Sequence, residues 1–265
     1  MGKMELGLRG KGALVTGASR GIAWEIARAL AAEGVSVAIC SRHQEEIEAA
    51  AREIEEATGS TAVPIVADMA RPDDIRRFVE GAAQQLGRID ILVNSAFVPR
   101  FGSLLDLPDE AIVEAFEAKL LGYARAALAA LLHMRRQGGG RIINIAGGSG
   151  RQPGPNIMPG MVNAAIVNLT KAMAEDLAPE KITVNAISPG LVNTQRWQGI
   201  QARMAQEQGV TPEEVYQRLA SGIPMGRLGR EGDIAAVAVY LASERASYIT
   251  GAHITVDGGS TRMAF

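Results

Sequence analysis

The sequence predicts an α/β fold in which one domain is built on a doubly wound, seven-stranded parallel sheet. Short runs of apolar and β-branched residues alternate with longer stretches of helical spacing along the chain. Most of these runs are continuously apolar, as expected of parallel strands that helices cover on both faces. Such alternation implies right-handed crossovers between parallel strands. No linker, repeat or low-complexity block divides the 265 residues, so we expect a single domain over residues 1–265.

The strands are expected at the seven apolar runs. In chain order these are Ala13–Thr16, Val35–Cys40, Ala62–Ala67, Ile89–Asn94, Arg141–Ile145, Ile182–Ile187 and Ile254–Val256. Helices are expected between them, because apolar residues recur at helical spacing from Ile47 to Ala57 and from Ile75 to Leu86. Pro159 has a fixed φ and no N–H, which predicts that the helix before the sixth strand begins near it. The stretch 191–230 has no strand pattern, and its length for a connection predicts a lid or substrate-binding loop.

Composition excludes several classes of partner. The chain has 27 Lys and Arg against 29 Asp and Glu, so it shows no electrostatic footprint for nucleic acid and no basic face for anionic membranes. The single cysteine, Cys40, allows no internal disulfide and no cysteine-based metal site. No His, Asp and Glu cluster has metal-ligand spacing, so no metal is expected. Without an 18-residue apolar run or an apolar signal core, we expect a cytoplasmic protein that does not enter a membrane.

A glycine-rich turn follows the first strand and opens the first helix. Residues 16–22 read Thr-Gly-Ala-Ser-Arg-Gly-Ile. Glycines there let the backbone approach a pyrophosphate, and the helix N-terminus offers free N–H groups to that anion. The spacing differs from the usual Gly-x-Gly-x2-Gly, and a plain tight turn is the alternative. The position between the first strand and a long helix favours a nucleotide site.

Several widely separated motifs, in the right order, resemble the short-chain dehydrogenase/reductase family from Leu8 to Gly259. They are the turn just described, Asp68 after the third strand, Asn94-Ser95-Ala96-Phe97 after the fourth, Asn185 and Ser188-Pro189-Gly190 at the end of the sixth, Met225–Gly229, and Val256–Gly259. The resemblance implies a Rossmann-type fold with a seven-stranded sheet and a nicotinamide cofactor. It also implies a small-molecule substrate and self-association as a homotetramer or homodimer.

The end of the second strand favours NADP(H) over NAD(H). An acidic residue at this place holds the adenosine ribose hydroxyls in NAD-binding proteins. Here the strand ends Ser41-Arg42-His43 without an acid, and Arg42 with Arg20 matches the geometry of a 2′-phosphate. The alternative is that both arginines are solvated surface charges. The expected cofactor-binding residues are Gly17, Ser19, Arg20, Gly21, Ile22, Ser41, Arg42, Asp68, Met69, Asn94, Ser95, Ala96, Pro189, Gly190, Val192 and Thr194.

The resemblance implies a catalytic Asn, Ser, Tyr and Lys, and this chain has a different residue at each of those positions. Counted from neighbouring motifs, the four positions fall on Lys119, Gly147 (or Ala146 with a different gap), Pro159 and Asn163. No tyrosine lies between residues 141 and 181, so no realignment restores the Tyr-x3-Lys pair. We therefore expect an atypical active site.

Lys119 interrupts an apolar and aromatic helix face that Ile112, Phe116 and Tyr123 share. Lysine at the family's Asn position and asparagine at its Lys position look like an exchange within one pocket. Lys119 is then a functional cation, or else a drifted residue whose head escapes to water. The candidate catalytic residues are Lys119, Asn163, Ser149 and Tyr123. For Ser149 a turn role, and for Tyr123 a core or interface role, is the alternative.

Three functions fit these observations. The first is an NADP(H)-dependent oxidoreductase for a small carbonyl or alcohol substrate, with a non-standard proton-transfer apparatus. The second is a lyase, isomerase or dehalogenase on the same scaffold. The third is a catalytically inactive NADP-binding sensor or partner protein, and the fold alone does not decide among them. Arg196 and Trp197 belong to the expected lid and are candidates to touch the substrate, whereas His253 is expected at an interface.

Overall fold

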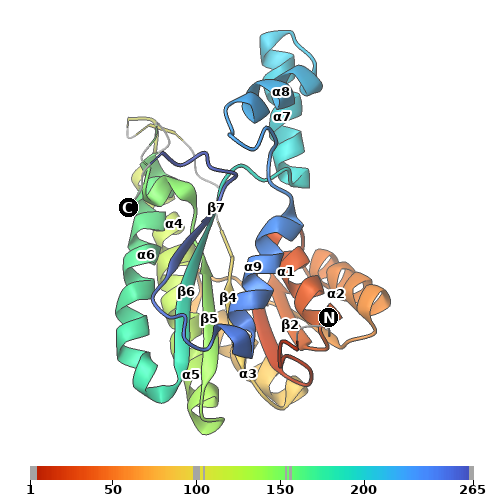
Figure 1. Cartoon of the computed structure of the whole chain (residues 1–265), viewed down its shortest axis with the longest axis vertical. Helices are drawn as coiled ribbons and strands as arrows, with labels where there is room; N and C mark the ends of the chain where they lie inside the picture. The colour runs from red at the N-terminus through yellow and green to blue at the C-terminus, as the bar shows by residue number, and fades with distance from the viewer. Residues whose placement is uncertain (1–4, 98–101, 104, 153, 155–156, 263–265) are drawn as a thin grey trace.

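The computed structural model of the protein describes residues 5–97, 102–103, 105–152, 154 and 157–262. Its sheet has seven parallel strands in the order β3-β2-β1-β4-β5-β6-β7, which confirms the predicted doubly wound α/β fold (Figure 1). The strands are β1 (Gly12–Thr16), β2 (Ser36–Ser41), β3 (Ala62–Val66), β4 (Ile91–Asn94), β5 (Gly140–Ile145), β6 (Ile182–Pro189) and β7 (His253–Val256). Each overlaps its predicted run, and their ends differ by one or two residues.

Helices cover both faces of the sheet (Figure 1). On one face lie α1 (Gly21–Ala32), α2 (Gln44–Thr58) and α9 (Glu231–Ala242). On the other lie α3 (Pro72–Leu86), α5 (Gly122–Arg136) and α6 (Ile157–Leu177). Short 3-10 turns are η2 (Gly148–Gly150), η3 (Ala178–Glu180) and η4 (Glu244–Ala246). The α6 helix contains Pro159 in its first turn, where a missing N–H leaves no intrahelical bond unmade.

Residues of each strand alternate between two apolar cores. In β1, Ala13 and Val15 pack against α1 and α9, whereas Leu14 packs on the opposite face with α3 and α5. All three side chains are fully buried. This double burial explains why the strands read as continuous apolar runs in the sequence.

The helix before β5 is continuous from residue 109 to residue 136 but changes its winding. It consists of α4 (Asp109–Ala115), the π-helical segment η1 (Phe116–Leu121) and α5. Short π-helical turns inside α-helices occur often at functional sites. Here the turn carries Lys119, which is 6% exposed.

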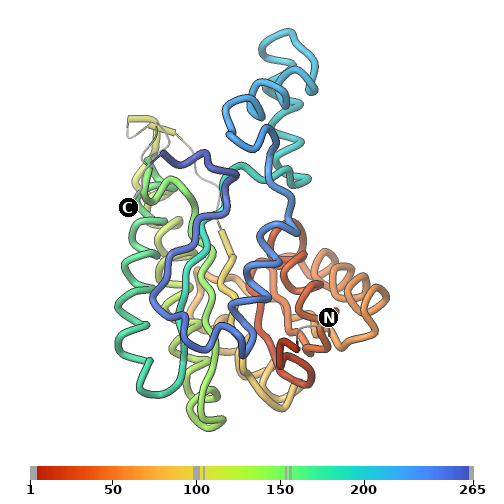
Figure 2. The backbone as a smooth tube through the Cα atoms, in the orientation of Figure 1, coloured from red at the N-terminus to blue at the C-terminus, as the bar shows by residue number. Residues whose placement is uncertain are grey.

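The segment 191–230, expected as a loop, is mostly helical. It contains α7 (Gln195–Gln208) and α8 (Pro212–Ser221), which rise beyond the carboxyl ends of the strands (Figures 1 and 2). Thr211 and Glu214 form a capping box, and Pro212 occupies the first turn of α8. That signature is legible in the sequence as Thr-Pro-Glu-Glu. A movement of this segment over a substrate remains a prediction.

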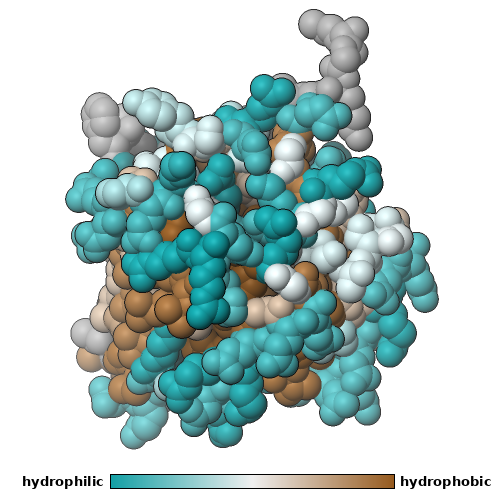
Figure 3. All heavy atoms as spheres, turned by 90° about the horizontal axis from the view of Figure 1, so that it is seen from below, coloured by the Kyte–Doolittle hydropathy of each residue, from teal (hydrophilic) through white to brown (hydrophobic). Residues whose placement is uncertain are grey.

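The face away from α7 and α8 is mainly hydrophilic, with a hydrophobic area toward one side (Figure 3). Exposed apolar side chains of the molecule include Leu128 and Leu132 on α5. In the described part of the chain, no helix combines the length and apolar character needed to cross a membrane.

A buried chain of polar side chains fixes β4, β5 and α6 relative to one another. The Asn94 amide donates to Asn144 Oδ1 at 3.0 Å, and Asn144 Nδ2 donates to Thr170 Oγ1 at 2.9 Å. Thr170 in turn donates to the Ile166 carbonyl oxygen at 2.8 Å. The three linked side chains are at most 1% exposed, so water cannot reach them. Their polar groups therefore depend on these hydrogen bonds.

Asn144→Ala should destabilise the protein by about 2–4 kcal/mol, because it leaves a cavity and removes partners from two buried polar groups. Thr170→Val keeps the shape but removes the acceptor of Asn144 Nδ2 and the donor to the Ile166 carbonyl oxygen, so its effect should be about 1–3 kcal/mol. Urea unfolding followed by circular dichroism measures both. A loss below about 1 kcal/mol for Asn144→Ala would contradict a structural role for this chain of bonds.

Candidate functional site

A cleft with a volume of about 930 Å³ opens at the carboxyl ends of the strands. Its floor lies where the strand order reverses between β1 and β4, the position at which doubly wound sheets bind ligands. Every residue expected to contact a cofactor lines this cleft except Asn94. Asn94 instead lies fully buried behind it, where its amide bonds to Asn144.

The middle of the cleft is shaped for an anion. Gly17 has φ +71°, and a Cβ there would lie 2.8 Å from Ala96 Cα, so only glycine fits between the ends of β1 and β4. The α1 helix starts at Gly21 without a side-chain cap and without an acid in its first turn. Its first N–H groups therefore remain available to a phosphate. The Thr194 methyl comes within 3.8 Å of a Cβ built on Gly21, so the start of α7 closes this part of the cleft.

The outer end of the cleft carries the positive charges that are expected near the 2′-phosphate of an adenosine. Arg42 and Arg20 line it, and neither forms a salt bridge with any residue that the structure describes. Ser41 donates to the His43 carbonyl oxygen at 3.2 Å, which shapes the turn that presents Arg42. Asp68 accepts from the Ala70 N–H at 3.0 Å and lines the cleft beside Met69.

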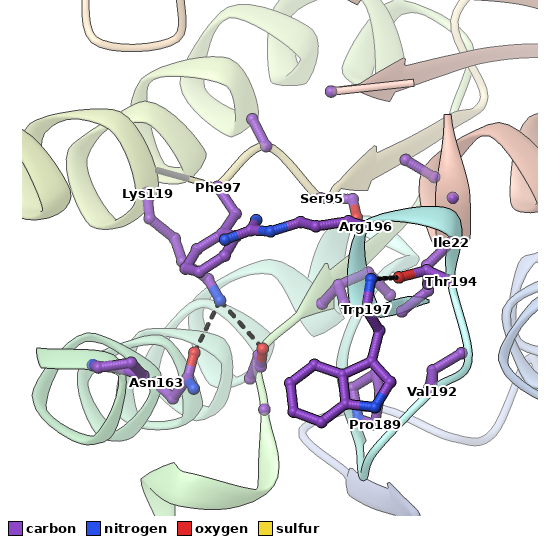
Figure 4. Close-up of a pocket in the computed structure, with 18 of the residues that line it drawn as sticks. Ile22, Ser95, Phe97, Lys119, Asn163, Pro189, Val192, Thr194, Arg196 and Trp197 are labelled. Carbon is purple, nitrogen blue, oxygen red and sulfur yellow. Dashed lines mark hydrogen bonds between the residues drawn. The ribbon is translucent and has the colours of Figure 1, made fainter. Parts of the chain in front are cut away.

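The inner end of the cleft brings Lys119 and Asn163 together (Figure 4). Lys119 Nζ donates to Asn163 Oδ1 at 2.7 Å and to the Ala146 carbonyl oxygen at 3.0 Å. Nζ also lies 5.5 Å from the Phe97 ring centroid and 6.0 Å from that of Tyr123. It forms no salt bridge with a described residue, and burial lowers its pKa from 10.5 to about 7. Near neutral pH the ammonium and the neutral amine are therefore both populated.

Ser149 completes a short chain of hydrogen bonds from Lys119. Asn163 Nδ2 donates to Ser149 Oγ at 3.0 Å, while the other end of the same amide holds Lys119. All three side chains line the cleft. Gly147 borders them, and a Cβ at this position would lie 2.5 Å from Asn163 Nδ2. A side chain at residue 147 is therefore incompatible with the present position of the Asn163 amide.

Tyr123 lies behind the site rather than in it. It is 1% exposed, does not line the cleft, and donates its hydroxyl to the Ile145 carbonyl oxygen at 3.1 Å. Burial raises the pKa of its phenol well above the usual 10. The structure thus brings together Lys119, Asn163 and Ser149 and leaves Tyr123 as a packing partner of the lysine.

The C-terminal segment after Gly259 supplies cleft residues that the sequence did not single out. The Asp257 carboxylate accepts from the N–H groups of Gly259 and Thr261 at 2.9 and 2.7 Å, which folds the chain back over the cleft. Thr261 and Gln152 both line the cleft, and Gln152 accepts from the Arg262 N–H at 3.0 Å. The Asp-Gly-Gly sequence was a legible turn signal for this fold-back.

Two other expectations concern His253 and metal ions. His253 is partly buried, and its Nε2 lies 2.6 Å from Ser188 Oγ, so the structure ties it to β6. Its expected place at an interface stays a prediction. Within the described ranges, no group of three or more His, Cys, Asp or Glu side chains is arranged to hold a metal ion.

Known proteins similar to this chain include several reductases. A family model described as Enoyl-(Acyl carrier protein) reductase matches residues 17–261. The NADPH-dependent reductase BacG of Bacillus subtilis (strain 168) is 36% identical over 256 residues, which cover 94% of this chain and 97% of BacG. The 3-oxoacyl-[acyl-carrier-protein] reductase FabG of Staphylococcus aureus (strain Mu50 / ATCC 700699) is 34% identical, covering 94% and 97% of the two chains.

A solved structure is also similar to this chain over nearly its whole length. The L-sorbose reductase of Gluconobacter frateurii, complexed with NADPH and L-sorbose, has a TM-score of 0.95 and 30% identity, covering 98% of this chain and 100% of that one. The chain belongs to the short-chain dehydrogenase/reductase family. This confirms the family that the separated motifs indicated.

The low pKa of Lys119 makes stability depend on pH. Because the folded-state pKa is about 7 and the unfolded value is 10.5, the unfolded chain holds more protons between these values, so stability rises with pH there. Between pH 6 and pH 9 the free energy of unfolding of the wild type should rise by about 2–3 kcal/mol more than that of Lys119→Met. Chemical denaturation at both pH values measures the difference. Parallel pH curves for the two proteins would show an ordinary lysine pKa.

Proposed function

We propose that the protein is an NADP(H)-dependent oxidoreductase that interconverts a carbonyl and an alcohol and uses Lys119 as its proton donor and acceptor. The observation that carries the proposal is the buried Lys119–Asn163 pair at the inner end of a cleft built for a dinucleotide. BacG, named an NADPH-dependent reductase, and the L-sorbose reductase solved with NADPH support the cofactor and the reaction class.

The residues of the cleft fit NADP(H). The close approach of Gly17 to Ala96 and the free N–H groups of α1 suit the pyrophosphate. Arg42 and Arg20 suit a 2′-phosphate, because a guanidinium matches phosphate geometry. Asp68 and Met69 would border the adenine, and Pro189 with Thr194 would border the nicotinamide half. When bound, NADPH supplies a hydride to the substrate carbon.

Lys119 is positioned to manage the proton. Two of its N–H groups are held by the Ala146 carbonyl oxygen and Asn163 Oδ1. The third N–H of the ammonium is left for the oxygen of a substrate carbonyl, on which negative charge develops during reduction. After that proton leaves, the neutral amine keeps both bonds, so the side chain stays in place. In the oxidation direction the same lone pair accepts the proton of the alcohol.

The substitutions at the family's catalytic positions support this assignment. Pro159 and Gly147 stand where the resemblance places Tyr and Ser, so neither position offers a hydroxyl. Tyr123 does not line the cleft and already donates its hydroxyl to a backbone oxygen. Ser149 remains as a hydroxyl at the site, and we assign it the positioning of the Asn163 amide.

A catalytically inactive NADP-binding protein is the second candidate. The absence of a hydroxyl at residues 147 and 159 favours it, and a non-redox reaction on the same scaffold would share this feature. An assay of hydride transfer from NADPH distinguishes the oxidoreductase from the other candidates. Loss of the reduced nicotinamide absorbance with a carbonyl panel supports the oxidoreductase, whereas saturable binding without turnover supports the inactive protein.

NADPH should bind more tightly than NADH, because β2 is followed by Arg42 rather than by an acid and Arg20 lines the same cleft. Losing a charge-assisted phosphate contact costs about 1.5–3 kcal/mol, so Arg42→Ala should weaken NADPH by about tenfold or more and leave NADH unchanged. Arg52→Ala, an exposed change on α2 outside the cleft, is the control. Calorimetry showing equal affinities for the two cofactors would overturn the assignment.

Turnover should depend on Lys119 and on its protonation. Lys119→Met should lower kcat by about 10²–10⁴-fold while NADPH still binds, because positioned proton transfer contributes that much. For reduction, kcat/KM should fall as pH rises through about 7, since the donor is the ammonium. For oxidation the dependence should be the reverse. Simple ketones and aldehydes should react slowly, because the usual oxyanion donors are missing.

Two outcomes would contradict the role of Lys119. One is turnover that survives Lys119→Met; the other is a reduction rate that stays constant from pH 6 to pH 8. Lys171→Met, at an exposed lysine paired with Glu175, is the control for loss of a positive charge. Gly147→Ser alone should also impair the enzyme, because its side chain displaces Asn163.

A further inference from the structure

Phe97 lies against two cations at the inner end of the cleft. Lys119 Nζ is 5.5 Å and Arg196 Cζ is 5.1 Å from the centroid of the same ring. Figure 4 shows the Arg196 side chain extending from the start of α7 across this ring toward Lys119. Both cations are therefore within reach of one small ligand that occupies the inner end.

The charges around Arg196 favour an anion. The pKa of Arg196 is lowered, first by burial and then by the positive charge of Arg20, so its guanidinium stands in a positive field. The acids that line the cleft lie elsewhere: Glu46 and Asp68 follow β2 and β3, and the carboxylate of Asp257 holds its own turn. No described acid lines the part of the cleft around Lys119 and Phe97.

We propose that Arg196 binds a carboxylate of the substrate while the substrate carbonyl meets Lys119, so the substrate class is keto acids and the corresponding hydroxy acids. This inference rests on the proposed oxidoreductase function. A guanidinium presents two parallel N–H groups to a carboxylate, and its position on the Phe97 ring limits its rotation. The carbonyl oxygen would then lie at the third N–H of Lys119. The aromatic ring of Phe97 forms the apolar wall between these two polar contacts.

Arg196 belongs to the reacting end rather than to the phosphate part of the cleft. Thr194, two residues earlier, faces Gly21 at the start of α1. The Arg196 side chain leads away from that point to Phe97, whose ring also contacts Lys119. A cofactor phosphate is the competing anion, and the experiment must separate the two.

The test measures binding, not turnover. The protein is saturated with NADP⁺, and calorimetry compares benzoylformate, 3-benzoylpropionate and 4-benzoylbutyrate with their uncharged primary amides. These acids place the carboxylate at increasing distances from the carbonyl. At least one acid should bind about tenfold more tightly than its amide, as expected for a charge-assisted bond. Arg196→Gln should abolish that preference and leave the amides and NADP⁺ unchanged.

Two further variants make the result specific. Arg196→Lys keeps the charge but loses the planar pair of donors, so it should keep only part of the preference. Arg203→Gln removes an exposed arginine of the same helix that pairs with Glu207, and should change nothing. The acid–amide comparison on the wild type needs no variant, so a folding defect in Arg196→Gln does not obscure the answer.

Three results would overturn the inference. They are an acid series that binds no better than the amides, an equal loss for acid and amide in Arg196→Gln, and a loss of NADP⁺ affinity in that variant, which would assign the guanidinium to a cofactor phosphate. Failure of the proposed function has a different signature, because NADPH would then bind without any loss of the reduced nicotinamide absorbance on the carbonyl panel, or NADP⁺ would not bind in the first titration.

Discussion

The site depends on one interaction, the hydrogen bond of the buried Lys119 amine to Asn163 Oδ1. A lysine with its head in the interior is expensive unless polar groups receive its protons. Here an amide oxygen and a backbone carbonyl do so without a neutralising acid among the residues that the structure describes, and burial leaves the pKa at about 7. A carboxylate in place of Asn163 would raise that pKa and fix the proton. The neutral Asn163 amide thus holds the Lys119 amine in position, and the amine can still gain or lose a proton.

The sheet places these two residues together although they are 44 positions apart in sequence. Lys119 comes from the π-helical turn before β5, and Asn163 from the first half of α6, which follows β5. The buried bonds among Asn94, Asn144 and Thr170 set the spacing between β4, β5 and α6. A change in that spacing would move the Ala146 carbonyl oxygen and the Asn163 amide, the two acceptors of Lys119, relative to each other.

Local patterns in the sequence were sufficient for the strands and for the glycine turn, because continuous apolar runs and the turn at residues 16–22 carry their own signals. Apolar spacing also indicated the buried face of Lys119. The π-helical winding at this residue has no comparable signal, since it arises from packing against the rest of the fold. The cation contact of Arg196 with Phe97 was equally invisible, because it joins segments that only the tertiary structure brings together.

Lys119, Gly147, Ser149 and Asn163 form a packed unit. A Cβ at Gly147 would lie 2.5 Å from Asn163 Nδ2, so a side chain there would force the Asn163 amide out of its present position. Asn163 in turn uses one end of its amide for Lys119 and the other for Ser149. Changing any one member therefore disturbs the others, and such contacts give non-additive effects. The role that we propose for Lys119 therefore depends on the hydrogen bonds and sterics at residues 119, 147, 149 and 163 together.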